Sequence, residues 1–201
     1  MDYKNGTREV YDKYAGVFEE YTSNFRQLFF SKQIELFIEI LPGKRVLDLG
    51  CGPGRDALFF QQKGLLPIGI DYSKVMIDLC KEKGLFAVLM DLEEPGFRDS
   101  SFDGVWANAS LLHIPKSRLQ PTLEKLAQIL APKGVLYIGM REGDTEGWLE
   151  SEKYPNMKRF FSLYTDEELK ERLSQSFQIL QSFRLPLWNN AMALNYLCRK
   201  K

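Results

Sequence analysis

The chain has 201 residues, 44% of them hydrophobic, and its 27 Lys and Arg balance its 27 Asp and Glu. This length and apolar content predict one globular domain over residues 1–201 and exclude disorder. A formal net charge of zero and the lack of a basic run argue against a nucleic-acid partner.

The sequence also contains no expected membrane or export signal. Its first residues are polar, and no apolar run approaches the roughly 20 residues that span a bilayer. The three cysteines, Cys51, Cys80 and Cys198, lie far apart, form no metal-binding pattern and indicate a reducing compartment. We therefore expect a cytoplasmic protein without membrane contact, acting as a monomer or homodimer.

Two helices are expected before the first strand, within residues 1–42. The first is rich in aromatic residues, including Tyr11 and Tyr14. These side chains either pin the helix to a sheet or form a mobile lid, whose aromatic faces would favour a cationic ligand and exclude water. The second helix has apolar residues at helical spacing and ends before Gly43.

A buried strand, a glycine turn and the start of a helix follow one another in residues 45–56. The pattern is Asp48-x-Gly50-x-Gly52-x-Gly54. Glycine has no Cβ and tolerates positive φ, so backbone and free N–H groups at a helix start lie close to a nucleotide-like ligand. The spacing differs from the Gly-x-Gly-x-x-Gly of dinucleotide folds.

Two further apolar strands end in acids, at Asp71 and Asp91. Asp71 lies 19 residues after Gly52, close to the spacing of the acid that accepts ribose hydroxyls. A simple turn residue is the alternative for Asp71. Parallel strands end at one edge of a sheet, where open α/β folds bind ligands.

A fourth strand is expected over residues 101–108, and the loop after it carries His113, the only histidine. A lone histidine is usually structural, but its ordinary pKa of about 6.5 also suits proton transfer near neutrality. An amphipathic helix over residues 119–130 and a Pro-x-Gly turn then lead into a strand at 135–140.

Residues 141–164 have little periodicity and many aromatic side chains. We interpret this segment as an insertion over the site that sets substrate choice, with a packed surface loop as the alternative. A capping box at Thr165 and Glu168 begins another helix. Two strands near residues 177–184 and 193–199 then form a closing hairpin.

The glycine motif, the strand-end acids and the Pro-x-Gly turn together resemble class I S-adenosylmethionine-dependent methyltransferases. The resemblance implies an α/β, Rossmann-like class I methyltransferase sandwich with helices on both faces. Its seven-stranded, mostly parallel sheet has the order 3-2-1-4-5-7-6, with the last strand antiparallel. It also implies S-adenosylmethionine as cofactor and S-adenosylhomocysteine as product.

The resemblance further assigns roles to individual positions. Asp71 would accept the ribose hydroxyls, while Asp91 and the backbone of Leu92 would contact the adenine. The expected cofactor-binding residues are Asp48, Gly50, Cys51, Gly52, Gly54, Asp71, Tyr72, Asp91, Leu92 and Asn108. The expected substrate-binding residues are Tyr11, Tyr14, Arg141, Trp148 and Tyr164. His113 is the candidate catalytic base or hydrogen-bond partner of the substrate.

The implied reaction moves a methyl group to an O, N or S atom of a small molecule by in-line displacement. Aligning the reactants accounts for roughly 7–11 kcal/mol of barrier lowering. The chain lacks the Asn/Asp-Pro-Pro-Tyr/Phe motif of base-amino methylation and the Pro-Cys pair of pyrimidine-C5 methylation. With no cluster of metal ligands, we expect no metal.

Two alternatives stay open from the residues alone. One is a protein that binds S-adenosylmethionine or a nucleoside without catalysis. The other is an NAD(P)-dependent reductase, which the Tyr154-x-x-x-Lys158 spacing would fit. That pair needs one helix face, and Pro155 disfavours a helix there.

Overall fold

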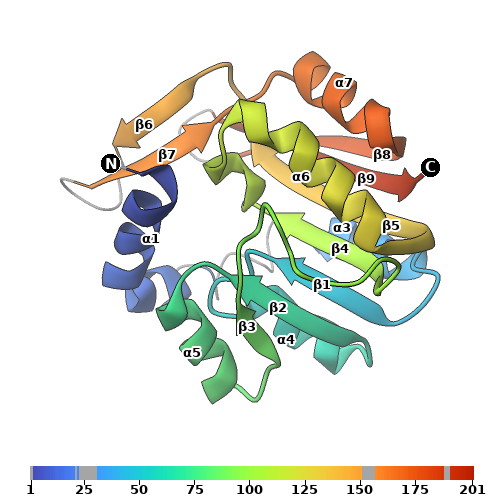
Figure 1. The fold of residues 1–201 in the computed structure, drawn as a ribbon, viewed down its shortest axis with the longest axis horizontal. Coiled ribbons are helices and arrows are strands. Elements are labelled where there is room, and N and C mark those ends of the chain that lie inside the picture. Colours follow the sequence, from blue (N-terminus) through green and yellow to red (C-terminus); the bar gives the residue numbers. More distant parts are fainter. Residues whose placement is uncertain (1, 21, 23–30, 151–156, 188–190) are drawn as a thin grey trace.

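The computed structural model describes residues 2–20, 22, 31–150, 157–187 and 191–201. A seven-stranded sheet crosses the molecule, and helices cover both of its faces (Figure 1). Tyr154 of the reductase-like pair lies outside the described residues, as do parts of the expected lid and insertion.

The sheet has the order β3-β2-β1-β4-β5-β9-β8. Its strands are β1 (Arg45–Leu49), β2 (Leu66–Asp71), β3 (Ala87–Leu89), β4 (Phe102–Asn108), β5 (Leu130–Arg141), β8 (Phe177–Pro186) and β9 (Met192–Lys200). The first five are parallel, whereas β9 runs antiparallel to both β5 and β8. The predicted strand order and antiparallel last strand are confirmed.

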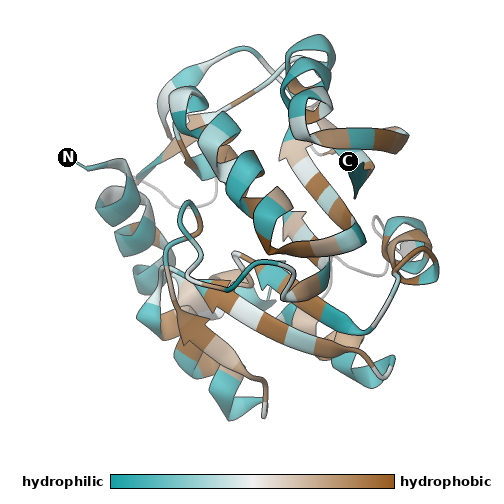
Figure 2. Ribbon diagram, turned by 45° about the vertical axis from the view of Figure 1, so that its right-hand side comes forward, coloured by the Kyte–Doolittle hydropathy of each residue, from teal (hydrophilic) through white to brown (hydrophobic). Residues whose placement is uncertain are grey.

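Amphipathic helices pack around the sheet because each has one apolar side to bury. They are α1 (Tyr3–Lys13), α3 (Ser31–Glu39), α4 (Arg55–Gln62), α5 (Lys74–Glu82), α6 (Lys116–Ile129), α7 (Asp166–Ser176) and the 3-10 helix η1 (Leu111–His113). Figure 2 shows hydrophobic residues concentrated in the central strands and hydrophilic ones on the outward turns of the helices.

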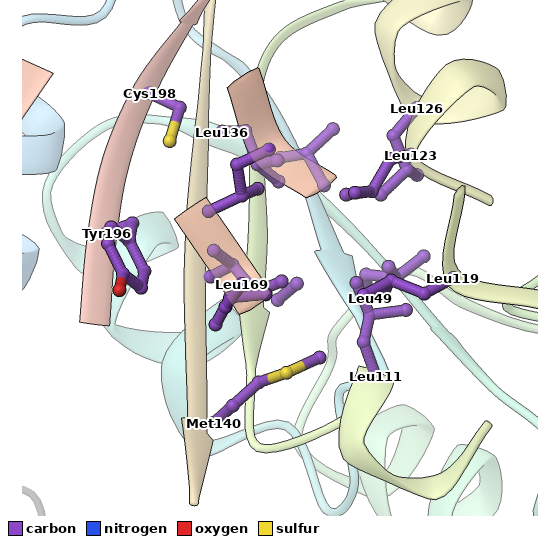
Figure 3. Packing of buried hydrophobic residues seen from close by; sticks show 14 of the residues in the cluster. Leu49, Leu111, Leu119, Leu123, Leu126, Leu136, Met140, Leu169, Tyr196 and Cys198 are labelled. Carbon is purple, nitrogen blue, oxygen red and sulfur yellow. The ribbon is translucent and has the colours of Figure 1, made fainter. Parts of the chain in front are cut away.

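The core divides into two layers, one on each face of the sheet. On one face, leucines of α6, such as Leu123 and Leu126, pack against β1 and β5 (Figure 3). On the other face, Trp106 of β4 stacks on Tyr137 of β5 at 3.7 Å, with Phe37 of α3 at its edge. These layers hold the parallel strands in register and thus align their carboxyl ends.

The segment 141–164 contains more regular structure than its pattern indicates. Strands β6 (Glu146–Glu150) and β7 (Lys158–Ser162) form a separate antiparallel hairpin. Partly buried residues follow one another in both strands, at 147–149 and 159–160, so no clean alternation marks the strands. The strand β5 also begins at Leu130, five residues before the expected start, with a register shift against β4.

Candidate active site

A cavity of about 330 Å³ lies at the carboxyl ends of the parallel strands. Residues that end β1, β2, β4 and β5, or directly follow them, line its floor. Its cover comes from α1, which lies between the β6–β7 hairpin and α5 (Figure 1). The edge of the sheet at which a ligand was expected thus forms the floor of a covered cavity.

The glycine turn forms one wall of this cavity. Gly50 and Gly52 have φ of +75° and +52°, which side chains with a Cβ rarely adopt. A Cβ on Gly50 would lie 2.4 Å from the Cβ of Ser110. The turn therefore requires glycine both for its backbone angles and for its close approach to the loop after β4.

Asp48 secures this turn from below. Its buried carboxylate accepts the Ala57 N–H in the first turn of α4 at 3.0 Å. Burial raises the pKa of Asp48 well above the ordinary value, and the nearby Asp56 charge adds to the rise. Asp48 lines the cavity, but its hydrogen bond with Ala57 positions the helix rather than a ligand.

Asp71 joins the glycine turn to the end of β2. Its two oxygens accept the Gly52 N–H at 3.0 Å and the Ser73 N–H at 2.8 Å. Burial raises the pKa of Asp71 to about 6, although these backbone bonds work in the opposite direction. Each carboxylate oxygen has a second lone pair available for a hydroxyl.

A buried acid that was not among the predicted site residues lies beside Asp48. Asp56 accepts hydrogen bonds from Arg55 at 2.7 Å, from the Trp106 indole at 2.9 Å and from Asn108 at 3.3 Å. Burial opposes its ionisation, but the Arg55 charge and these bonds outweigh it and lower the pKa of Asp56. An acid in the first turn of α4 was the only sequence signal.

Acids after β3 hold the start of α1 over the cavity. Lys4 lies 2.6 Å from Asp91 and 3.0 Å from Glu93. The Tyr3 hydroxyl and Arg118 also bond to Glu93, which was not predicted. Burial raises the pKa of Glu93, but the Arg118, Tyr3 and Lys4 bonds dominate and lower it.

His113 takes part in a network that joins three separate segments. Its Nδ1 donates to the Phe160 carbonyl at 2.7 Å, so in the neutral ring Nε2 accepts the Tyr11 hydroxyl at 2.8 Å. Arg159 of β7 donates in turn to the Tyr11 oxygen at 2.7 Å. Burial and the Arg159 charge lower the pKa of His113 to about 3, so the ring is neutral near pH 7.

The structure brings most of the expected site residues to the cavity. Those that line it are Tyr11, Asp48, Gly50, Cys51, Gly52, Asp71, Tyr72, Asp91, Leu92, Asn108, His113 and Arg141. Arg159, Glu93 and Asp56 line it as well without having been predicted. In the sequence these three resemble ordinary surface charges. Contacts between distant segments place them at the cavity.

Four expected residues lie away from the cavity lining. Gly54 packs against Leu85 and Cys80 instead, and Tyr14 lies just beyond the end of α1. Trp148 forms a T-shaped contact with the Phe160 ring, with the ring centroids 6.0 Å apart. Tyr164 is fully buried in the core cluster, directly before the cap residue of α7. Gly54 nevertheless donates its N–H to the Cys51 carbonyl at 3.0 Å, whereas Tyr14, Trp148 and Tyr164 do not line the cavity.

Part of the N-terminal region lies directly on the glycine turn. A Cβ on Gly52 would be 3.3 Å from the Phe18 ring. The Phe18 ring also packs against the Tyr11 ring, with the ring centroids 5.1 Å apart. Thr7 of α1 accepts the Phe160 N–H of β7 at 3.1 Å. The described part of the expected aromatic lid is therefore placed over the site.

Neither metal-binding clusters nor membrane-spanning helices occur in the described ranges. No three His, Cys, Asp or Glu side chains there are grouped so as to hold a metal ion. No helix within these ranges has both the length and the apolar character to cross a bilayer.

The sheet order, the glycine turn with Asp71 at the next strand end, and the cavity above them define one class of protein. This chain carries a class I S-adenosylmethionine-dependent methyltransferase domain. The family model of a methyltransferase domain matches residues 46–134.

Two relatives match about 70% of this chain. An uncharacterized protein of Methanocaldococcus jannaschii is 30% identical over 138 residues, covering 68% of this chain and 63% of that one. The Arabidopsis thaliana tRNA (carboxymethyluridine(34)-5-O)-methyltransferase is 29% identical over 149 residues, covering 70% of this chain and 35% of that one. The chain thus spans less than two thirds of either relative.

A solved structure shares the fold over nearly the whole chain. It is the Burkholderia thailandensis 1,6-didemethyltoxoflavin-N1-methyltransferase with bound 1,6-didemethyltoxoflavin and S-adenosylhomocysteine. It is similar with a TM-score of 0.70 and 23% identity, covering 94% of this chain and 89% of that one.

Proposed function

We propose that this protein transfers a methyl group from S-adenosylmethionine to an O, N or S atom of a small molecule by direct in-line displacement. One observation carries the proposal: Asp71, the glycine turn and the loop after β4 line a single cavity beneath α1. The cofactor supplies a methyl group already activated on a sulfonium, so the protein's task is to align the reactants and exclude water.

The residues present fit this cofactor. Gly50 and Gly52 line the cavity with backbone at positive φ and no side chain, and Asp71 retains lone pairs for two ribose hydroxyls. The Ser110 hydroxyl is buried, lines the same cavity and has no hydrogen-bond partner among the described residues. Such an orphaned polar group favours a polar ligand at that point.

The remaining site residues are assigned to the acceptor and the cover. Tyr11 and Arg141 line the cavity as candidate acceptor contacts. Because both ring nitrogens of His113 are occupied, we assign His113 as a positioning residue for Tyr11 rather than a base in this state.

A small acceptor suits this covered cavity better than a macromolecule. The cover formed by α1 and β7 closes over a volume of about 330 Å³, and the chain has no net charge to attract a polyanion. Relatives act on acceptors as different as a tRNA nucleoside and a toxoflavin precursor, so the acceptor class rests on this chain's own cavity.

Calorimetry with S-adenosylmethionine tests the binding site. Asp71→Ala should weaken binding by about 1.5–3 kcal/mol, since the ribose hydroxyls lose a charged acceptor. Asp99→Ala removes an exposed carboxylate outside the cavity and should leave the affinity unchanged. Equal affinity of both variants and the unchanged protein would contradict the assigned site.

A methyl-transfer assay then separates an enzyme from a non-catalytic binding protein. Transfer of labelled methyl groups to small molecules, retained in excess chelator, is the expected result. Binding without any transfer would favour the binding protein, and preferential binding of NADPH would favour the reductase.

A further inference from the structure

Charges of opposite sign line opposite parts of the cavity. On one side are Asp48 within β1, Asp71 at the end of β2 and Asp91 after β3. Arg141 at the end of β5 and Arg159 of β7 line the other part. A ligand that extends beyond the cofactor therefore meets positive charge.

Arg141 differs from Lys4, Arg8 and Arg55 of the same cavity in having no ion-paired acid among the described residues. Lys4, Arg8 and Arg55 lie 2.6, 3.6 and 2.7 Å from Asp91, Asp12 and Asp56, respectively. Arg141 forms no ion pair with any residue in the described ranges, and its side chain is exposed to solvent. Its charge is thus available to a ligand.

Arg159 is held firmly on the wall of the same cavity. Its guanidinium lies 5.2 Å from the Tyr11 ring centroid and 5.0 Å from that of Phe161. It also donates to the Tyr11 hydroxyl at 2.7 Å. A planar guanidinium positioned in this way is suited to a planar anion.

The same region offers no free proton acceptor on His113. Its Nδ1–H is bonded to the Phe160 carbonyl, and its Nε2 already accepts the Tyr11 proton. A hydroxyl or thiol acceptor must lose a proton, whereas a carboxylic acid is already ionised at neutral pH because its pKa is near 4. The arrangement favours an acceptor that is anionic before it binds.

We propose that the acceptor is a small carboxylic acid, recognised by Arg141 with Arg159 beside it, and that it is methylated on a carboxylate oxygen. This inference rests on the proposed function. The carboxylate oxygen forms a bond to the methyl carbon, the sulfur–methyl bond breaks and its electron pair stays on sulfur. The products are a methyl ester and S-adenosylhomocysteine, and no proton is released.

The carboxylate of the cofactor's methionine is a second possible partner of these arginines. The shared chemistry is a guanidinium–carboxylate pair, so the two sources must be separated by experiment. If Arg141 binds the acceptor, its loss changes transfer and spares cofactor affinity. If it binds the methionine carboxylate, its loss weakens cofactor binding.

Labelled product identifies the acceptor atom. The purified protein is incubated with methyl-tritiated S-adenosylmethionine and an ultrafiltered small-molecule cell extract. Methyl esters release volatile tritiated methanol in alkali, whereas N-, S- and ether O-methyl products do not. Alkali-volatile label is expected, and alkali-stable label alone would overturn the inference while leaving the proposed function intact. Cofactor binding without label transfer would contradict both.

Arginine variants test recognition. Arg141→Gln should raise the KM for the acid about 10- to 100-fold, the loss expected for bonds to a charged group, with the calorimetric affinity for S-adenosylmethionine unchanged. Arg141→Lys should restore the KM for the acid only in part, because lysine lacks the forked geometry of the guanidinium. Arg98→Gln removes an exposed arginine outside the cavity and serves as the matched control. Weaker cofactor binding by Arg141→Gln, or an unchanged KM, would overturn the proposal.

Discussion

Single residues of this site have protonation states that follow from their surroundings. Asp71 is desolvated without a full-charge partner, so its pKa rises to about 6. His113 is desolvated beside Arg159, so its pKa falls to about 3. Near neutral pH the first is therefore a charged hydrogen-bond acceptor and the second a neutral ring with a fixed tautomer.

Asp71 makes cofactor affinity depend on pH. Ribose hydroxyls donate to the carboxylate form, so S-adenosylmethionine should bind more weakly as the pH falls through about 6. Calorimetry between pH 5 and pH 8 measures this, and Asp71→Asn should remove the dependence. A pH-independent affinity of the unchanged protein would contradict the role of Asp71.

The raised pKa also affects the stability of the fold without cofactor. A carboxyl whose pKa is higher in the folded state than its ordinary 3.8 contributes stability below pH 3.8, and that contribution is lost as the pH rises through about 6. Asp71 is therefore retained at neutral pH at some cost to stability, as expected for a binding residue.

His113 gives a second prediction at this scale. With a carboxylate acceptor, His113→Gln should lower turnover less than about 10-fold, because no base is needed. If a hydroxyl or thiol is the acceptor, loss of a base typically costs about 10²–10⁴-fold. Single-turnover rates and a melting curve for the same variant distinguish a chemical loss from unfolding.

At the scale of elements, the cover over the cavity depends on a few polar contacts. The helix α1 is fastened to β7 by Thr7, to the loop after β3 by Lys4, and to η1 by Tyr11. Its buried residues are few, namely Gly6, Thr7 and Val10. An element held in this way opens at a lower free energy than the core strands.

Thr7→Val should loosen this cover selectively. The substitution keeps the shape but leaves the Phe160 N–H without its acceptor, at a cost of about 1–3 kcal/mol. Hydrogen exchange of residues 3–13 should accelerate accordingly. Thr122→Val is the matched control, since the buried Thr122 hydroxyl donates within α6, to the Arg118 carbonyl at 2.8 Å. Equal exchange in both variants would contradict the docking role of Thr7.

At the scale of the whole molecule, stability resides in the packed layers on the two faces of the sheet. Leu126 of α6 is fully buried against this core. Truncating such a leucine removes apolar contacts and leaves a cavity. The free energy of unfolding then falls by the lost burial energy and by the cost of the cavity.

Leu126→Ala should lower the free energy of unfolding by about 2–5 kcal/mol in urea denaturation. Leu66→Ala is the control, because Leu66 is 62% exposed and should cost far less. Similar losses for both leucines would show that α6 does not carry the core as described.

The strand order followed from the family resemblance that the motifs of the sequence carry. The sequence by itself determined the glycine turn and the acids Asp71 and Asp91. These features rest on local signals: apolar runs, a glycine spacing and an acid at a strand end. Such signals can be read from the sequence because the backbone angles of glycine and the alternation of side chains along a strand depend on neighbouring residues.

Only the tertiary structure decided the acceptor side of the cavity. The bonds of Tyr11 to His113 and to Arg159 join residues 102 and 148 positions apart. It also formed the β6–β7 hairpin and buried Tyr164 in the core. These outcomes depend on which distant segments pack together, and so do the charges and proton positions that follow from desolvation. No local pattern records such contacts.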